Sequence, residues 1–229
     1  SLAAMSPYAT AQRGQGSCLG ISLLLIILGQ KVDAPLSAVL APEHMFVRIE
    51  RGETRINLEP IKDGETRSDG WYRERYDVGE NSWYYPLRNL AHEEAAGVYF
   101  YNLGNVMREK GNAAGAVRSY RRATELFEDY PVAWGNLGVA LQERGEDKRA
   151  LEALTRAREL DSTLANLQAN IAALKLRLQR HDEAIADYAQ ALSEDPDNAR
   201  LQYGLAYACY GVGDYEGALK LIDEQPGAL

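Results

Sequence analysis

The sequence predicts a small α+β domain followed by an all-α superhelix of repeated helix pairs. An apolar segment of helical length begins at Cys18, and two segments of alternating apolar and polar residues then flank a turn at 51–53, as in a β-hairpin. From about residue 97 the chain repeats with a period of 34 residues, which is typical of stacked helix pairs. We therefore place the α+β domain at 1–90 and the repeats at 91–229.

Composition narrows the classes of partner. The chain has 229 residues, 46% of them hydrophobic, and a formal net charge of −8. Nucleic acid is not expected as a partner, because the acidic balance lacks the basic stripe that phosphate binding needs. The apolar run 19–29 is too short for a bilayer core of about 30 Å, so we expect no membrane span. These features favour a soluble, cytoplasmic protein, with a signal peptide removed before Ser1 as the alternative.

The thiol of Cys18 is placed for reactivity by its local sequence. Gly16 and Ser17 precede the apolar run, so we expect Cys18 in the first turn of a helix. The partial positive charge at a helix N-terminus lowers the pKa of a thiol, and a neighbouring imidazolium lowers it further. Cys18 is therefore a candidate nucleophile. The alternative is a buried structural cysteine, since free cysteine is among the most buried residue types.

The hairpin brings a histidine to a carboxylate. We predict strands over Met45–Glu50 and Thr54–Glu59. With a two-residue loop at Arg51–Gly52, His44 lies directly opposite Glu59. Directly opposed residues have Cβ atoms about 4.5–5.5 Å apart, so the carboxylate can hold the imidazole and fix its tautomer. A structural histidine with no catalytic role is the alternative.

The two faces of this hairpin place conflicting demands on the helix that carries Cys18. His44 shares its face with Phe46 and Arg48. The opposite face is apolar, with Met45 and Val47, and the apolar helix should cover that face. The thiol must nevertheless approach the imidazole. Either the helix end reaches around the edge of the sheet, or this assignment of faces is incomplete.

Three segments resemble the bacterial transglutaminase-like domains of the papain-type superfamily, in which Cys, His and Asp follow in that order. They are Gly14–Cys18, Ala41–Arg48 and Asn57–Pro60, and the resemblance spans about residues 8–90. It implies that Cys18 is the nucleophile, His44 the general base and acid, and Glu59 the orienting carboxylate. The chain departs from the family by carrying Glu where Asp is usual, which changes the reach of the side chain. The domain looks partial.

This resemblance implies an amide hydrolase or a transglutaminase-like acyltransferase that works through a thioester. Gln12 lies six residues before Cys18, the spacing at which papain-like proteases often place an oxyanion donor, with backbone donors near the cysteine as the alternative. A catalytically inactive binding or assembly adaptor is the alternative function. No cofactor is expected, and without an HExxH motif or a Cys/His cluster no metal site is expected.

The repeated part closely resembles the tetratricopeptide repeat (TPR). Asn102–Gly104, Asn136–Gly138 and Asn170–Ala172 recur at the repeat interval, and small residues recur where paired helices must pack closely. We place four units at 97–130, 131–164, 165–198 and 199–229. Such units stack so that their first helices line a groove, and the expected partner is a protein or peptide segment.

Nine residues are candidates for lining this groove: Tyr101, Asn105, Arg108, Asn136, Gln142, Asn166, Asn170, Tyr203 and Tyr207. The carboxylate clamp that some TPR proteins use for chaperone tails requires basic residues, and Tyr101, Asn166 and Asn170 stand in their place, so a clamp of that type is not expected. Between the two parts lies an aromatic-rich stretch at 71–86. We expect it to pack at the interdomain junction, with a cleft wall beside Cys18 as the alternative.

Overall fold

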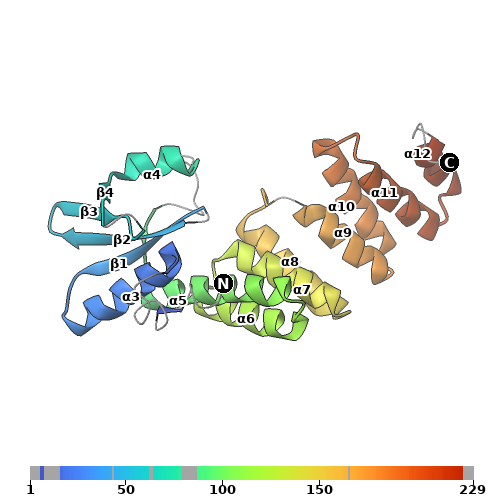
Figure 1. Cartoon of the computed structure of the whole chain (residues 1–229). Coiled ribbons are helices and arrows are strands. Elements are labelled where there is room, and N and C mark those ends of the chain that lie inside the picture. The colour runs from blue at the N-terminus through green and yellow to red at the C-terminus, as the bar shows by residue number, and fades with distance from the viewer. Residues whose placement is uncertain are drawn as a thin grey trace. The chain divides into compact units, whose positions relative to one another are not determined.

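The computed structural model describes residues 6–7, 16–42, 44–61, 64–78, 87–164 and 166–223 (Figure 1). Its contacts divide the chain into two compact units, Ser1–Glu128 and Asp129–Leu229, which are described separately. The first unit contains a sheet, two flanking helices and the first helix pair of the repeats. The last strand ends at Leu90 and the next helix begins at His92. The predicted domain boundary near residue 90 stays a prediction.

Helix α3 (Cys18–Lys31) carries the thiol on its first residue, as predicted. Ser17 is its N-cap, because the Ser17 hydroxyl accepts a hydrogen bond from the peptide N–H of Gly20 at 3.1 Å. The helix packs on strands β1 (Leu36–Ala41) and β2 (His44–Arg51). The hydroxyl of Ser22 also donates to the carbonyl of Met45 at 3.2 Å, which fixes the helix against the start of β2.

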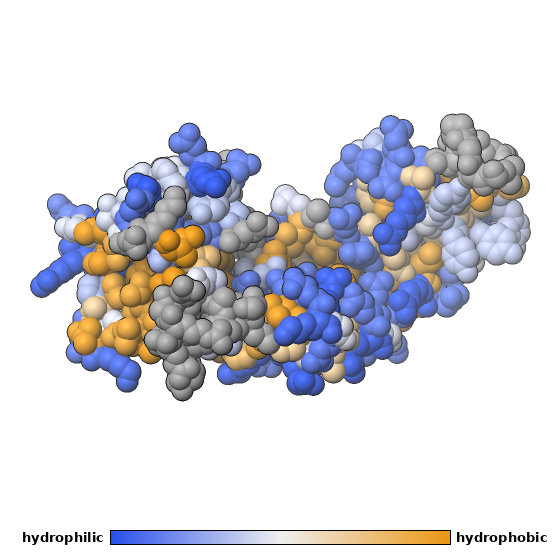
Figure 2. Space-filling model, in the orientation of Figure 1, coloured by the Kyte–Doolittle hydropathy of each residue, from blue (hydrophilic) through white to orange (hydrophobic). Residues whose placement is uncertain are grey.

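The apolar side chains of α3 itself project on all sides of the helix, so the face turned away from the sheet is also apolar. Figure 2 shows apolar surface over this helix, where Ile27 and Leu28 are 43% and 50% exposed. Within the described ranges, no helix is both long and apolar enough to cross a membrane.

The sheet is antiparallel and has the strand order β4-β3-β2-β1-β5. The predicted hairpin is confirmed as β2 and β3 (Thr54–Leu58). Strand β1 and the two short strands β4 (Thr66–Arg67) and β5 (Asn89–Leu90) were not predicted from the sequence. β1 pairs with β2 along its whole length, which places the hairpin in the middle of the sheet.

The register of the hairpin differs from the prediction by two residues. Arg51 pairs with Thr54 and Glu50 with Arg55, so the two-residue loop is Gly52-Glu53. Gly52 has a φ of +61°, which a glycine adopts readily at the first central position of a tight hairpin turn. The predicted placement of His44 directly opposite Glu59 is therefore wrong. A shift of two residues preserves the alternation of side chains, so both residues keep the same face of the sheet, in a diagonal relation.

Helix α4 (Asp69–Arg75) covers the face of the sheet opposite to α3 (Figure 1). Its N-cap is Ser68, whose hydroxyl accepts from the peptide N–H of Trp71 at 3.1 Å. Tyr72 enters the core on this face and is fully buried. The buried cluster there consists of Val39, Ala41, Phe46, Tyr72, Val78 and Leu87.

A buried arginine ties α4 to the sheet. Arg48 on β2 is only 1% exposed, and its guanidinium donates to Asn57 Oδ1 at 2.7 Å and to the carbonyl of Leu87 at 2.6 Å. The same guanidinium pairs with Asp69 Oδ1 at 2.6 Å, at the first residue of α4. Since removing a buried cation leaves several partners unsatisfied, this side chain is expected to set the position of α4.

From His92 to Asp223 the described residues fold into four helix pairs, and the predicted bounds of the repeat units stay a prediction. The pairs are α5 (His92–Glu109) with α6 (Ala113–Leu126), α7 (Pro131–Glu143) with α8 (Asp147–Leu160), α9 (Leu167–Arg177) with α10 (His181–Glu194), and α11 (Ala199–Gly211) with α12 (Tyr215–Asp223). Paired helices pack closely at glycines. A Cβ added at Gly138 would lie 2.5 Å from Leu154 Cδ2, and one added at Gly104 would lie 2.5 Å from Tyr120 Cδ1. At these two positions glycine fits without a shift of its neighbours, and even an alanine does not.

Candidate thiol site

The start of α3 and the start of β2 bring the thiol and the imidazole together. Cys18 is the first residue of the helix and His44 the first residue of the strand. The imidazole of His44 and the backbone of Met45 both favour the thiolate of Cys18. The first side chain of α3 and the first side chain of β2 therefore act on one another, which answers the conflict between the two sheet faces.

The imidazole in turn pairs with the predicted carboxylate. His44 Nε2 lies 3.0 Å from Glu59 Oε2, and the two side chains are 5% and 3% exposed. Because Nε2 faces the carboxylate, Nδ1 is the nitrogen left for the thiol. Glu59 and Cys18 therefore both act on the imidazole of His44.

The environment lowers the pKa of the Cys18 thiol. Burial alone raises this pKa, but the hydrogen bond with His44, the backbone N–H groups of Met45 and Leu19 and the positive charge of His44 together outweigh burial. The Leu19 contribution comes from the first turn of α3, whose N–H groups have no partner within the helix. These contributions all favour the thiolate, which is the nucleophilic form of cysteine.

The pKa of His44 moves in the opposite direction. Burial lowers it, but the hydrogen bond with Cys18 and the negative charges of Glu59 and Cys18 raise it more, so the net shift is upward. A lowered thiol pKa beside a raised imidazole pKa favours a thiolate–imidazolium pair.

Glu59 reaches the imidazole diagonally. It lies one residue beyond β3, where its peptide N–H donates to the carbonyl of Glu65 at 2.8 Å. Diagonal neighbours in a sheet are about 7–8 Å apart, compared with about 5 Å for opposed residues, so the longer glutamate side chain suits this position better than aspartate. Tyr72 donates its hydroxyl to Glu59 Oε2 at 3.4 Å. Within the part of the chain that the structure describes, Oε1 is buried and has no hydrogen-bond partner.

Aromatic rings of α4 lie against the imidazole. The Tyr76 ring is stacked on His44 with a centroid distance of 4.8 Å and an interplanar angle of 6°, and the Tyr72 ring lies at 6.1 Å. We expected this stretch at an interdomain junction, but these two tyrosines form a wall beside the site, which was the alternative interpretation. Their spacing of four residues puts them on one helical face, a signal that was available in the sequence.

Several features considered in the sequence lie outside this site or outside the described residues. Gln12, the predicted oxyanion donor, lies outside the described residues, as does the part of the aromatic stretch at 79–86. Cys209 is buried on α11, and both described cysteines are free thiols. Searched over the described residues alone, the chain contains no group of three or more His, Cys, Asp or Glu that could hold a metal ion.

The predicted groove residues lie on the first helices of the four pairs. In the compact unit Ser1–Glu128, helix α5 carries Tyr101, Asn105 and Arg108. In the compact unit Asp129–Leu229, the groove residues are Asn136 and Gln142 on α7, Asn166 and Asn170 at α9, and Tyr203 and Tyr207 on α11. The tyrosines on α11 are 43% and 61% exposed. Asn105 Oδ1, in contrast, accepts a hydrogen bond from the Tyr120 hydroxyl at 2.7 Å, so this amide has a structural role within the first repeat.

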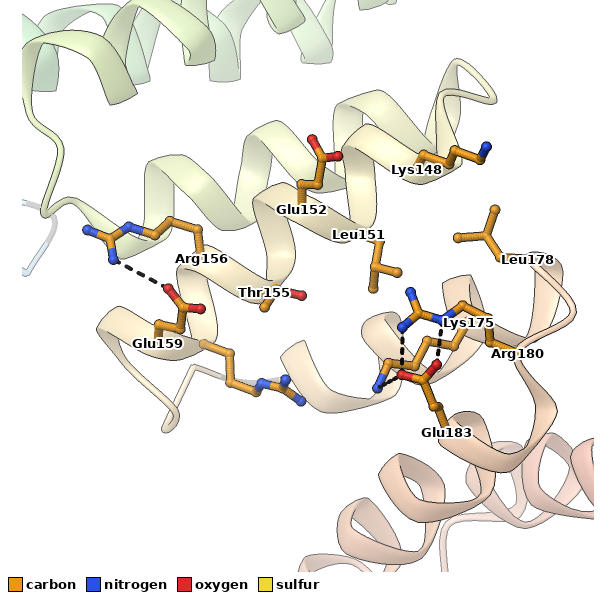
Figure 3. A pocket seen from close by; sticks show the side chains of 11 residues that line it. Lys148, Leu151, Glu152, Thr155, Arg156, Glu159, Lys175, Leu178, Arg180 and Glu183 are labelled. Carbon is orange, nitrogen blue, oxygen red and sulfur yellow. Dashed lines mark hydrogen bonds and ion pairs between the residues drawn. The ribbon is translucent and has the colours of Figure 1, made fainter.

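A separate pocket lies in the second unit between α8, α9 and α10, with a volume of about 730 Å³. Figure 3 shows ion pairs among some of its charged side chains. Arg156 lies 3.4 Å from Glu159, and Arg180 lies 2.6 Å from Glu183, which also lies 3.5 Å from Lys175. Of these ion pairs, the one between Lys175 and Glu183 links α9 to α10, and no cysteine or histidine is among the residues that line the pocket.

Comparison with known proteins identifies the repeats. Residues 101–165 and 175–228 each match a family profile of the tetratricopeptide repeat. The predicted all-α array of TPR units is therefore confirmed. No curated protein matches this chain. The transglutaminase-like resemblance of the first part stays a prediction.

Several solved structures share the repeat fold. MamA from Desulfovibrio magneticus RS-1 is 18% identical with a TM-score of 0.53, over 56% of this chain and 72% of that chain. Another crystal structure of MamA is 24% identical with a TM-score of 0.53, over 56% and 75% of the two chains. YrrB, described as a TPR protein with an unusual peptide-binding site, is 24% identical with a TM-score of 0.54, over 56% and 66%. At these identities the likeness shows the fold alone.

Proposed function

We propose that this protein is a TPR scaffold attached to a papain-type thiol site that transfers acyl groups of a protein or peptide partner. The single observation that supports the chemistry is the buried pair of His44 and Glu59 beside the thiol of Cys18. The three residues follow in the expected order, and the pKa of Cys18 is lowered while the pKa of His44 is raised, as a cysteine nucleophile needs.

The reaction would proceed through a thioester. The Cys18 thiolate attacks the carbonyl carbon of an amide, and the imidazolium of His44 gives its proton to the departing amine. Glu59 holds the imidazole in place and balances its positive charge. Water or a second amine then attacks the thioester, with His44 as the general base, and frees the thiol. Water gives hydrolysis and an amine gives transamidation.

The repeats would supply the partner. TPR arrays present the first helices of successive units as a binding surface, and YrrB carries a peptide-binding site on this fold. Within the second unit, Tyr203 and Tyr207 offer exposed aromatic rings one helical turn apart on α11. Exposed aromatic side chains are frequent binding hot spots because they bury large areas at low entropic cost.

The thiol pair is tested by the rate of Cys18 alkylation with iodoacetamide as a function of pH. The parent carries Cys209→Ser so that one thiol reacts, and it is compared with His44→Ala and with His92→Ala, an exposed histidine at the start of α5. We expect an apparent thiol pKa well below about 8.5, raised by His44→Ala and unchanged by His92→Ala. Slow alkylation that does not depend on His44 would leave the inactive adaptor as the better interpretation.

Acyl transfer is tested with p-nitrophenyl acetate, an activated ester that needs no partner recognition. We expect a burst of p-nitrophenol and acetylation of Cys18 detected by mass spectrometry, both lost in Cys18→Ala. If the thiol pKa is low but neither the burst nor acetylated Cys18 appears, the site stabilises its own thiolate without supporting acyl transfer.

Peptide binding is tested by screening the full chain against an immobilised peptide array. Tyr207→Ala is expected to weaken binding of the selected peptide by tenfold or more, about 1.4 kcal/mol, whereas Tyr215→Ala on α12 is the matched control. Both tyrosines are similarly exposed, at 61% and 60%. Equal losses in the two variants would place peptide binding outside the groove.

A further inference from the structure

Tyr76 is the aromatic residue nearest to the imidazole in the described part of the chain. It is the C-cap of α4, and its peptide N–H donates to the carbonyl of Tyr72 at 3.1 Å. The two rings are parallel within 6°, with centroids 4.8 Å apart, whereas Phe46 lies at 6.4 Å. This is the geometry of face-to-face contact, in which the ring covers one side of the imidazole.

We propose that Tyr76 is a positioning residue for the thiol site, whose ring holds the imidazolium of His44 in the plane that joins Cys18 to Glu59 and stabilises its positive charge. The proposal rests on the proposed thiol function. The face of an aromatic ring carries negative electrostatic potential, so a cation stacked on it is stabilised relative to the neutral form. The stabilisation is larger in a desolvated site such as this one, where His44 is 5% exposed.

The surrounding charges favour the same assignment. The titratable groups that face the imidazole are the Cys18 thiol from α3, the Glu59 carboxylate after β3, and the phenols of Tyr72 and Tyr76 from α4. Two cations act on these phenols, Arg67 on Tyr72 and Arg75 on Tyr76, and the Arg75 guanidinium carbon lies 5.6 Å from the Tyr76 ring centroid. The Tyr76 ring thus contacts the imidazole and also lies near the Arg75 guanidinium, while Glu59 approaches the imidazole at Nε2.

The ring and the hydroxyl of Tyr76 have separate expected effects. If the ring acts on His44, Tyr76→Phe keeps the effect and Tyr76→Leu removes it. Loss of the ring favours the neutral imidazole, so the pKa of the His44 imidazolium falls. The expected fall is about 0.4 to 1.5 pH units. The thiolate then has a protonated partner over a narrower pH range.

The experiment is an NMR titration of the His44 ring in the full chain. The chain has only three histidines, so His44→Ala assigns the signal and His92 serves as an internal reference. Trp71→Leu is the matched structural control, because Trp71 packs edge-on against Tyr72 and Tyr76 on the same helix but is not stacked on His44. Circular dichroism and a thermal melt establish that each variant is folded.

Each outcome decides one question. We expect the His44 titration to fall in Tyr76→Leu, to stay near the parent in Tyr76→Phe, and to stay near the parent in Trp71→Leu. If Tyr76→Leu titrates like the parent, or if Trp71→Leu shifts as far, the ring has only a packing role and the inference is overturned. If the parent itself shows no coupling between His44 and Cys18, measured by the change in the titration with Cys18→Ala, the proposed thiol function fails instead.

Discussion

Glu59→Asp tests whether the reach of this side chain suits its diagonal position. In the parent, Glu59 Oε2 lies 3.0 Å from His44 Nε2. Aspartate is one methylene shorter, which withdraws the carboxylate by about one carbon–carbon bond, about 1.5 Å. We expect the hydrogen bond to be lost and the pKa of His44 to fall, because the imidazolium loses its nearest negative partner.

The size of this effect follows from Coulomb's law. At an effective dielectric constant of about 20, two unit charges attract by about 5.5 kcal/mol at 3.0 Å and by about 3.7 kcal/mol at about 4.5 Å. The difference of about 1.8 kcal/mol corresponds to a fall of about 1.3 pH units in the titration of the imidazole. Glu59→Gln keeps the length and removes the charge, so its fall should be larger still.

The sign of the accompanying stability change is also determined. The pKa of His44 is raised on folding, so its contribution to stability is fully present below the unfolded pKa of about 6.5 and is lost as pH rises through the folded value. The destabilisation caused by Glu59→Asp should therefore be largest near pH 6 and should shrink at about pH 9. Urea denaturation at several pH values measures it.

The assay is the NMR titration of the His44 ring in the parent, Glu59→Asp and Glu59→Gln, with Glu65→Asp as a control on an exposed carboxylate. A titration in Glu59→Asp that matches the parent would refute the reasoning, because it would mean that either side chain reaches the imidazole and that the diagonal register has no consequence for the site.

Three further predictions follow from contacts described above. Arg48→Met should lower the free energy of unfolding by about 3–5 kcal/mol in urea denaturation. Arg55→Met, at a side chain 54% exposed, should change it by less than about 1 kcal/mol. Similar losses in the two variants would contradict the role given to buried Arg48 in fixing α4. Gly138→Ala should cost about 1–3 kcal/mol by overpacking, while Gly135→Ala on the same helix, with open space around it, should be neutral or stabilising, and thermal melts compare the two. Cys18→Ala should lower the pKa of the neighbouring imidazole, and an unchanged NMR titration would rule out the pair.

The face of the hairpin could be predicted from the sequence, whereas the register of its strands could not. Alternation placed His44 and Glu59 on one face, and this relation is insensitive to a register error of two residues. The loop position was misjudged because Gly52 was assigned to the second central position of the turn, although its positive φ suits the first. The face of a hairpin is therefore a safer inference than its register.

The remaining parts of the site depend on contacts that a single sequence does not display. The sequence pattern indicates only that Arg48 is a polar residue of a strand. The fold then brings Asp69 and the carbonyl of Leu87 to its guanidinium. The role of Tyr76 depends on the placement of α4 across the sheet, which no local pattern determines. The repeats were predictable in detail because their packing is between neighbours in the sequence, and a fixed period reports it directly.

The division of the chain after Glu128 places the first repeat in the same compact unit as the thiol. Helix α5 contacts both α3 and β1, so its surface belongs to the body that holds Cys18. Under the proposed function, a segment bound along α5 would keep a constant distance from the thiol, because both belong to one compact unit. The first repeat would then set how far along that segment the thiol could act.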